Sequence, residues 1–289
     1  MSSEYKKECY DVNKNIKIHY SHGVRGASST LSFLHYDEDL IIEFYRKGHS
    51  SVHIEGNIYN ISEGDVLILN PDELHVTIRS DDCYMEKIVL HINEGLLSQF
   101  GIERLVFFEK ISKKEKGKGN LITSSAVSDF SIDEKIENCL CLAKENSLEN
   151  QVLLTCKTIE LLSKLSKLIE KDEEKIISTY TSNDRVNKII DYINRHHTEE
   201  ITLDSLSRHF HFSKYYISHL FKDYVGISPY DYLIARRLYC CNNLIRSNHT
   251  IKEACLLVGF NNYSNFYRLY KKYFKITPQQ FKEQLKTEQ

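Results

Sequence analysis

A unit of about thirty residues occurs twice in the C-terminal third of this 289-residue chain. The first copy runs from Thr202 to Tyr232 and the second from Thr250 to Phe281, offset by forty-eight residues at first and by forty-nine after one inserted residue. Apolar and aromatic residues fall at matching places in both copies, and both contain an Ile-Ser/Thr-Pro end. A duplicated supersecondary unit constrains the fold, because each copy is expected to form the same local structure.

The second copy predicts two helices around a tight turn. Thr250 and Glu253 have the spacing of a capping box, which starts a helix, and Gly259 can take the positive φ that a sharp turn requires. A second helix is predicted from near Asn262, with an apolar face of Phe266, Leu269, Tyr270 and Tyr273. Its opposite face carries Tyr263, Ser264, Tyr267, Arg268 and Lys271. This pattern is typical of a helix-turn-helix whose second helix lies in a major groove.

The first copy has the same pattern and a long helix behind it. Ser213 is the expected N-cap of its second helix, whose outward face is Lys214, Tyr215, Ser218, His219 and Lys222. Val186, Ile189, Ile190 and Ile193 predict an amphipathic helix before the first copy. Ser228-Pro229 predicts the start of a helix that continues to about Arg246, roughly 28 Å long at 1.5 Å per residue. Such a helix can set two recognition helices about one DNA turn, ~34 Å, apart.

The motif residues resemble those of a known family. Ala254-Cys255, Val258-Gly259-Phe260, Ser264, Phe266, Arg268, Lys271-Lys272, Phe274 and Thr277-Pro278 closely resemble the pattern of AraC-type transcription regulators, over roughly Val186 to Lys282. One departure is Lys275, where the family pattern usually has Gly at a left-handed cap. The resemblance implies a regulator that binds promoter DNA and is not an enzyme.

By family position, two groups of side chains are expected to contact DNA. The base readers are Tyr215, Ser218, His219, Tyr263, Ser264, Tyr267 and Arg268, and the phosphate contacts are Lys214, Lys222, Lys271 and Lys272. Arg268 can bind guanine through two hydrogen bonds, whereas Tyr and Ser make single hydrogen bonds or thymine-methyl contacts. The structural alternative for Arg268 is an ion pair with a nearby carboxylate, and for the lysines a merely solvated face.

The charge of the chain is divided unevenly. Residues 185–289 contain sixteen Lys and Arg against nine Asp and Glu, a net +7, whereas residues 1–184 contain twenty-two against thirty-one, a net −9. A basic C-terminal region suits a phosphate backbone as partner.

The N-terminal part predicts a small β-barrel. Residues 1 to about 30 are polar and aperiodic, which indicates an arm. Short strands are predicted at 40–45, 51–54, 57–61, 66–69, 76–78 and 86–92, separated by turn residues. The order Gly56, Gly64-Asp65, Pro71, His75 resembles the cupin-like sensor barrels that precede this DNA-binding domain in many family members.

The resemblance implies a small-molecule effector inside the barrel. The candidate lining residues are His35, Tyr45, His53, His75 and Met85, for each of which an ordinary core or strand-surface position is the alternative. Among family members, a chain rich in Lys, Asn and Ile leans slightly toward carbohydrate metabolism, so the resemblance favours a carbohydrate effector, while the residues themselves do not distinguish a sugar from an aromatic acid or a lipid. The paired histidines of metal-dependent cupin enzymes are missing, and His35-Tyr36-Asp37 stands in their place. We therefore expect no metal, no other cofactor and no catalytic residues.

Helices are predicted after the barrel. The stretches 133–146 and 148–171 are amphipathic, and the second has a wide apolar surface. Family resemblance gives 148–171 a role in homodimerisation, and packing on the chain's own barrel is the alternative. Lys113–Asn120 is expected to be an exposed loop, and Glu170–Asn183 a linker. The expected division is 1–93 for the barrel and arm, 94–175 for the helical dimerisation and linker segment, and 184–289 for the double helix-turn-helix.

These patterns predict an α+β chain of two domains: a cupin-like β-barrel with a helical dimerisation segment, then an all-α domain with two helix-turn-helix motifs joined by a long helix. No stretch approaches eighteen apolar residues and the N-terminus lacks an apolar leader segment, so we expect a cytoplasmic protein. The eight scattered cysteines contain no CxxC pair and are expected to be free thiols. The predicted function is a ligand-responsive activator, with RNA polymerase as a further partner. The alternatives are a regulator without an effector and, more remotely, a metal-dependent cupin enzyme fused to a DNA-binding domain.

Overall fold

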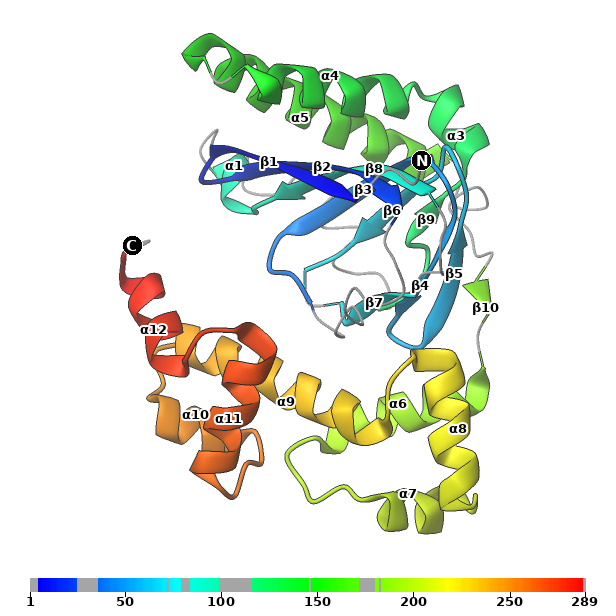
Figure 1. The fold of residues 1–289 in the computed structure, drawn as a ribbon, viewed down its shortest axis with the longest axis vertical. Helices are drawn as coiled ribbons and strands as arrows, with labels where there is room; N and C mark the ends of the chain where they lie inside the picture. Colours follow the sequence, from blue (N-terminus) through cyan, green and yellow to red (C-terminus); the bar gives the residue numbers. More distant parts are fainter. Residues whose placement is uncertain are drawn as a thin grey trace. The chain divides into compact units, whose positions relative to one another are not determined.

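The computed structural model describes residues 5–24, 36–71, 73–78, 84–98, 116–145, 147–171, 180–181 and 183–287 (Figure 1). By their contacts, the described residues up to Thr181 form one compact unit and residues 183–287 belong to another. The first unit combines two sheets with helices, and the second is built from helices, as the sequence predicts.

Two antiparallel sheets face each other in the first unit. The larger has the strand order β1 (Lys6–Asn13), β2 (Ile16–Val24), β8 (Tyr84–Ile92), β3 (Leu40–Lys47), β6 (Val66–Leu69) and β9 (Leu121–Ile122). The smaller has the order β10 (Tyr180–Thr181), β5 (Asn57–Ile61), β4 (Ser50–Ile54) and β7 (His75–Ile78). The six predicted strands are confirmed as β3 to β8. The prediction of an irregular N-terminal arm is wrong, because residues 6–24 form a β-hairpin that pairs with β8.

Side-chain alternation gives the larger sheet two buried faces. Along β3, Ile41 and Tyr45 point between the sheets, where they meet residues such as Val52. Ile42 and Phe44 point to the opposite face, which packs against helices. The space between the two sheets, called the barrel interior below, and the layer beneath the helices are therefore separate cores.

The helices of the first unit cover that second face. Among the described residues they are α1 (Gly95–Ser98), α3 (Ser124–Asp129), α4 (Ile132–Lys144) and α5 (Leu148–Lys171). Leucines along most of α5 are fully buried in the same core as the sheet: Leu154, Leu161, Leu162, Leu165 and Leu168. Packing on α4 and on the sheet of the same chain thus accounts for most of the apolar surface of 148–171. Only near the start of α5 do large apolar side chains stay exposed, namely Leu148 (76%), Val152 (61%) and Leu153 (50%).

The segment before α3 is docked rather than an exposed loop. Of its described residues, Gly117 and Asn120 are buried. The Tyr59 hydroxyl donates a hydrogen bond to the Gly117 carbonyl at 2.6 Å, and the Gly117 amide donates to Glu73 at 2.9 Å. The prediction of an exposed loop is therefore wrong for Gly117–Asn120. The predicted linker, Glu170–Asn183, is also not irregular throughout, because Tyr180–Thr181 near its end forms a strand that pairs with β5.

The second unit consists of seven helices in the described range 183–287. They are α6 (Asp184–His196), α7 (Leu203–Phe210), α8 (Lys214–Val225), α9 (Pro229–Arg246), α10 (Ile251–Leu257), α11 (Tyr263–Phe274) and α12 (Pro278–Thr287). Helices α7–α8 and α10–α11 are the two predicted helix-turn-helix copies, and α9 is the predicted connecting helix (Figure 1).

The predicted caps and turns fix these helices. Thr250 and Glu253 form the capping box, and Ser213 and Ser228 accept hydrogen bonds from the first turns of α8 and α9. Gly259 has φ +90°, and a Cβ there would clash with the carbonyl oxygen of Thr198, so glycine is required at this turn. Lys275 ends α11 in the left-handed conformation, with φ 61°.

Candidate functional site

The outward face of α8 is exposed and aromatic. The Oγ atom of Ser213 accepts a hydrogen bond from the Tyr216 amide at 3.2 Å, which fixes where the helix begins. Tyr215 is 74% exposed, and its ring lies 4.2 Å from that of His219 between centroids. Lys214 forms an ion pair with Asp204 of α7. The Asp204 carboxylate therefore competes with DNA phosphate, the predicted partner of Lys214.

The outward face of α11 combines tyrosines with a guanidinium. Asn262 caps the helix by accepting a hydrogen bond from the Asn265 amide at 2.8 Å. Tyr263 and Tyr267 are 44% and 39% exposed. Arg268 donates a hydrogen bond from Nη2 to the Asn265 side-chain oxygen at 3.1 Å, and no carboxylate among the described residues pairs with it. The guanidinium of Arg268 is thus held at the surface by the neutral side-chain amide of Asn265. The sequence analysis did not assign this role to Asn265.

Both recognition helices are anchored on α9 through their inner faces. The rings of Phe221 in α8 and Tyr232 in α9 meet edge to face at 5.6 Å between centroids. The hydroxyl of Tyr270 in α11 donates to the Asn242 side chain of α9 at 2.6 Å, and burial raises the pKa of this tyrosine well above its ordinary value. One buried face on each helix therefore leaves the opposite face for a partner.

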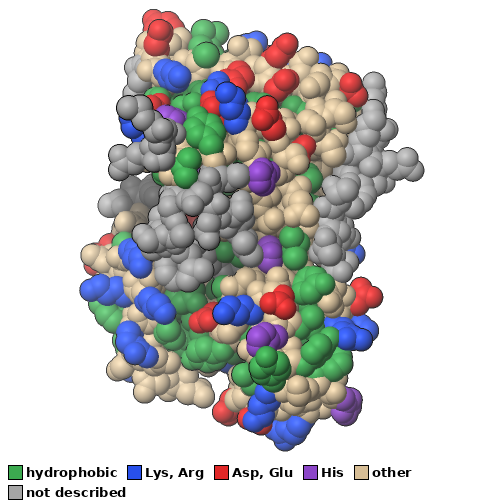
Figure 2. All heavy atoms as spheres, turned by 45° about the vertical axis from the view of Figure 1, so that its right-hand side comes forward, with side chains coloured by type: hydrophobic (Ala, Val, Ile, Leu, Met, Phe, Trp, Pro, Cys, Tyr) green, Lys and Arg blue, Asp and Glu red, His purple; other side chains and the backbone are tan. Residues whose placement is uncertain are grey.

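The remaining predicted DNA contacts also lie at the surface of the second unit. Ser264, Lys222, Lys271 and Lys272 are exposed, and Ser218 is half-buried. In Figure 2 the helical unit presents a mixed surface on which Lys and Arg side chains lie among hydrophobic and acidic ones.

Arg237 has a structural role instead. Its guanidinium donates hydrogen bonds to the carbonyl oxygens of His197 and Glu199, both at 2.6 Å, and so connects α9 to the segment before α7.

The predicted effector residues divide into two groups in the barrel. Tyr45 and Met85 belong to the core between the sheets, and His75 pairs with Ile54, whose side chain points the same way. His53 lies on the opposite face of its strand from Val52 and Ile54, so it does not point into the interior as expected. His35 lies outside the described residues.

A charged pair that the sequence did not reveal lies inside the barrel. Lys87 Nζ and Glu43 Oε1 are 2.7 Å apart, and the Tyr45 hydroxyl donates to Glu43 Oε2 at 2.7 Å. Burial would raise the pKa of Glu43, but the Lys87 charge and these hydrogen bonds hold it at about 2. His75 faces this pair, and its Nε2 lies 3.5 Å from Asp37. The inner face of the sheet is therefore polar beside Tyr45.

Two histidines extend this polar face across the neighbouring strands. The rings of His19 in β2 and His91 in β8 lie 4.8 Å apart between centroids. Burial lowers the pKa of both, that of His19 to about 4, so both imidazoles are neutral at pH 7. Neutral imidazoles can both donate and accept hydrogen bonds.

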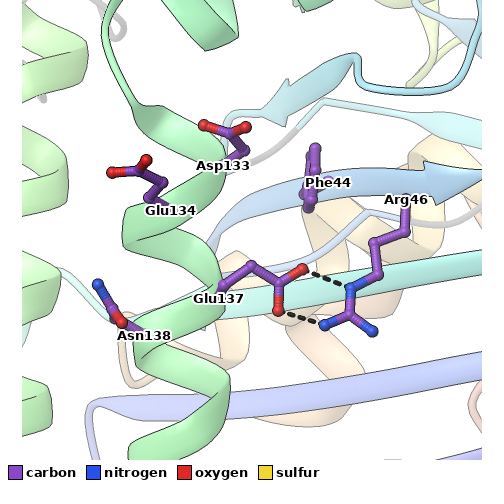
Figure 3. A pocket seen from close by; sticks show the side chains of 6 residues that line it. All are labelled: Phe44, Arg46, Asp133, Glu134, Glu137 and Asn138. Carbon is purple, nitrogen blue, oxygen red and sulfur yellow. Dashed lines mark hydrogen bonds and ion pairs between the residues drawn. The ribbon is translucent and has the colours of Figure 1, made fainter.

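A hollow lies outside the barrel, between β3 and α4 (Figure 3). It is lined by Phe44, Arg46, Asp133, Glu134, Glu137 and Asn138. Arg46 forms a two-pronged ion pair with Glu137 and also contacts Glu86 at 2.7 Å, so its charge joins the helix to the sheet. These contacts assign the hollow to packing between α4 and the sheet.

Within the described ranges, no group of three or more His, Cys, Asp or Glu side chains could hold a metal ion. None of the helices in that part of the chain is both long and apolar enough to cross a membrane.

Comparisons with known proteins match both units. Residues 28–111 match the family model for an AraC-like ligand binding domain, and residues 206–284 match one for a helix-turn-helix domain. An uncharacterized HTH-type transcriptional regulator of Staphylococcus aureus (strain COL) is 23% identical over 90% of this chain and 33% of its own length. The transcriptional regulatory protein HptR of Staphylococcus aureus is 33% identical over 35% of this chain and 40% of its own length. The chain thus spans well under half the length of these relatives.

Two solved structures illustrate the similarity of the chain to known proteins. ToxT from Vibrio cholerae O395 is 14% identical, with 97% of this chain and 98% of that chain covered and a TM-score of 0.39. The C-terminal domain of the two-component response regulator yesN from Fusobacterium nucleatum is 30% identical, covering 35% of this chain and 99% of that chain with a TM-score of 0.33.

Proposed function

We propose that this chain, which belongs to the AraC-type transcription regulators, binds two successive major grooves of promoter DNA under the control of a small-molecule effector. In this proposal residues 184–289 bind DNA, 1–93 hold the effector, and 94–175 contribute the dimer contact and linker. The observation that carries it is the pair of exposed faces on α8 and α11, each backed by a buried face on α9.

The expected roles of the exposed residues follow their chemistry. Tyr215, Ser218 and His219 of α8, with Tyr263, Ser264, Tyr267 and Arg268 of α11, would contact bases, and Lys214, Lys222, Lys271 and Lys272 would contact phosphates. Lys222, Lys271 and Lys272 lie in the last turns of their helices, away from the capped ends. Their charge would supply affinity and salt dependence rather than sequence choice.

Selection of bound duplexes from random DNA by the full chain tests this function. The expected result is one enriched motif with two sub-sites about ten base pairs apart. Affinity for that motif should exceed affinity for scrambled DNA at both low and high salt. Binding that is equal on all sequences and simply falls with salt would contradict the proposal.

The effector is proposed to bind on the polar inner face of the barrel, near Tyr45, Lys87 and His75. This face offers donors and acceptors together, which suits a hydroxyl-rich ligand such as a carbohydrate. A thermal-shift screen of neutral sugars, aromatic acids and fatty acids against the full chain tests this. A sugar present at 100 times its dissociation constant should add about 2.7 kcal/mol to stability. Stabilisation by none of the three classes would favour the alternative of a regulator without an effector.

The homodimer is proposed through the start of α5 rather than along all of 148–171. Leu148, Val152 and Leu153 are exposed there, whereas the leucines that follow are buried in the protomer. Val152→Asp should increase the monomer fraction of the full chain in analytical ultracentrifugation, and the free energy of unfolding should stay unchanged. Lys167→Asp, which changes an exposed position near the other end of α5, is the matched control and should leave association unchanged. An equal effect of both changes would refute this location.

The sign of regulation is proposed to be activation, with contact to RNA polymerase. Transcription from the selected motif in a purified system, with and without the chain, decides this. A fall in transcript would make the chain a repressor.

A further inference from the structure

The duplication provides an internal comparison of the two recognition helices. Ser213 and Asn262 cap α8 and α11, and both helices have twelve residues, so positions correspond at a constant offset. Tyr215 then corresponds to Ser264, and His219 to Arg268. The two helices therefore place different side chains at corresponding positions of the same backbone structure.

Helix α11 carries the only guanidinium on either recognition helix, in a range that the structure describes completely. Arg268 is exposed, and its hydrogen bond to the neutral Asn265 side chain orients it without neutralising its charge. A guanidinium with no carboxylate partner at this place can donate two hydrogen bonds to O6 and N7 of guanine.

Helix α8 carries an aromatic pair instead. Tyr215 is the most exposed of the Tyr and Phe side chains on the two helices, and the tilted ring of His219 lies 4.2 Å from its ring between centroids. Two cations lie near the start of α8 and both are engaged: Lys214 is paired with Asp204 of α7, and Arg185 donates a hydrogen bond to the Tyr216 hydroxyl. An exposed ring whose neighbouring cations near the start of the helix are engaged suits the C5-methyl group of thymine rather than the acceptors of guanine.

We infer that the two sub-sites of the operator differ in composition: α11 reads guanine through Arg268, and α8 reads thymine through Tyr215, with His219 positioning the ring. This inference rests on the proposed DNA-binding function and assigns a base class to each helix. The operator is thus asymmetric within the site of a single chain, and its direction fixes the orientation of the bound protein.

Base analogues in the selected duplex test each contact at a single atom group. Deoxyuridine lacks only the thymine methyl, and 7-deazaguanine lacks only the N7 acceptor. For the full chain, deoxyuridine in the α8 sub-site should weaken binding roughly fourfold, as expected for one buried methyl group. 7-Deazaguanine in the α11 sub-site should weaken it on the order of tenfold.

Variants assign each effect to its residue. Tyr215→Ala should abolish the deoxyuridine effect and keep the 7-deazaguanine effect, and Arg268→Ala should do the reverse. His219→Phe retains a ring against Tyr215 and should keep the deoxyuridine effect, whereas His219→Ala should reduce it. All of these side chains are exposed, and thermal melting of each variant checks that it folds.

A reciprocal exchange uses the correspondence of the two copies. His219→Arg should introduce a guanine preference into the α8 sub-site when selection is repeated, and Arg268→His should remove guanine from the α11 sub-site. An enriched motif with guanine in both wild-type sub-sites, or analogue effects that persist in Tyr215→Ala and Arg268→Ala, would overturn the inference while leaving the DNA-binding function intact. Absence of any enriched motif would overturn both.

Discussion

Replacing Lys275 with glycine is expected to stabilise the helical unit. Lys275 ends α11 with φ 61° and ψ 0°, and the corresponding residue at the end of α8 is Gly226, with φ 79° and ψ −7°. Both copies thus require a left-handed residue, but only the first has glycine there.

The magnitude follows from two opposing terms. A side chain with a Cβ costs about 1–2 kcal/mol in the left-handed conformation. Glycine recovers this but loses about 0.5–1 kcal/mol because its unfolded chain is more flexible. The exposed hydrogen bond from Lys275 Nζ to the Lys272 carbonyl, 3.0 Å long, contributes little in water. The net gain for Lys275→Gly is about 0.5–1 kcal/mol, which raises the melting temperature of a unit of this size by about 2–8 °C.

Differential scanning calorimetry of the full chain measures this effect. The transition of the helical unit should rise in Lys275→Gly and fall by a similar amount in Gly226→Lys, the matched reverse change, with the transition of the sheet unit unchanged in both. If Lys275→Gly melts at the same temperature as the parent or below it, the reasoning from backbone conformation is refuted.

Three further predictions concern the barrel, the DNA contacts and a helix start. Lys87→Met should destabilise the sheet unit by about 3–5 kcal/mol, because it leaves the buried carboxylate of Glu43 without its cation. In the parent, the pKa of Glu43 is lowered to about 2 from an ordinary value of 4.5, so its contribution to folding stability is present above pH 4.5 and is lost as the pH falls toward 2. In Lys87→Met the sheet unit should instead become more stable as the pH falls. Denaturant titrations of the parent and the variant at several pH values measure the two trends. Lys271→Ala should weaken binding to every duplex alike and reduce the salt slope by about one, and an unchanged slope would remove it from the phosphate contacts. Thr250→Ala should cost about 1 kcal/mol by removing the cap of α10, whereas Thr250→Ser should retain most of the stability, and equal losses would exclude a capping role.

The helical unit could be predicted from sequence in some detail because its signals are local. The caps at Ser213, Ser228 and Thr250 lie within three residues of the amides that they accept from, so their spacing alone sets where helices begin. The duplication then confirmed each pattern independently. What could not be predicted is which exposed side chains are engaged by neighbours, such as Lys214 with Asp204, because that contact joins two helices.

The sheet unit was harder because its signals depend on pairing. The β1–β2 hairpin was missed since one face of β2 is polar and exposed at Lys17, although Ile16 and Ile18 alternate on its buried face. The strands β9 and β10 have two residues each, which is too short for any periodicity. Such strands are recognisable only once their partners are known.

The barrel interior shows the same limit. Glu43 and Lys87 are forty-four residues apart and meet because β3 pairs with β8. His53 was expected inside, but a strand's register decides which face each residue occupies, and a one-residue difference reverses it. The apolar surface of 148–171 could be recognised from periodicity, but not whether it would pack on the chain's own sheet or on another copy.

Hydroxyl-radical footprinting of the full chain on its selected duplex measures directly whether one chain reads two grooves. The predicted result is two protected stretches about ten base pairs apart on one face of the DNA. Tyr215→Ala should reduce protection near the α8 sub-site, and Arg268→Ala should reduce it near the α11 sub-site. One protected stretch per chain, lost equally in both variants, would contradict the two-helix mode of binding.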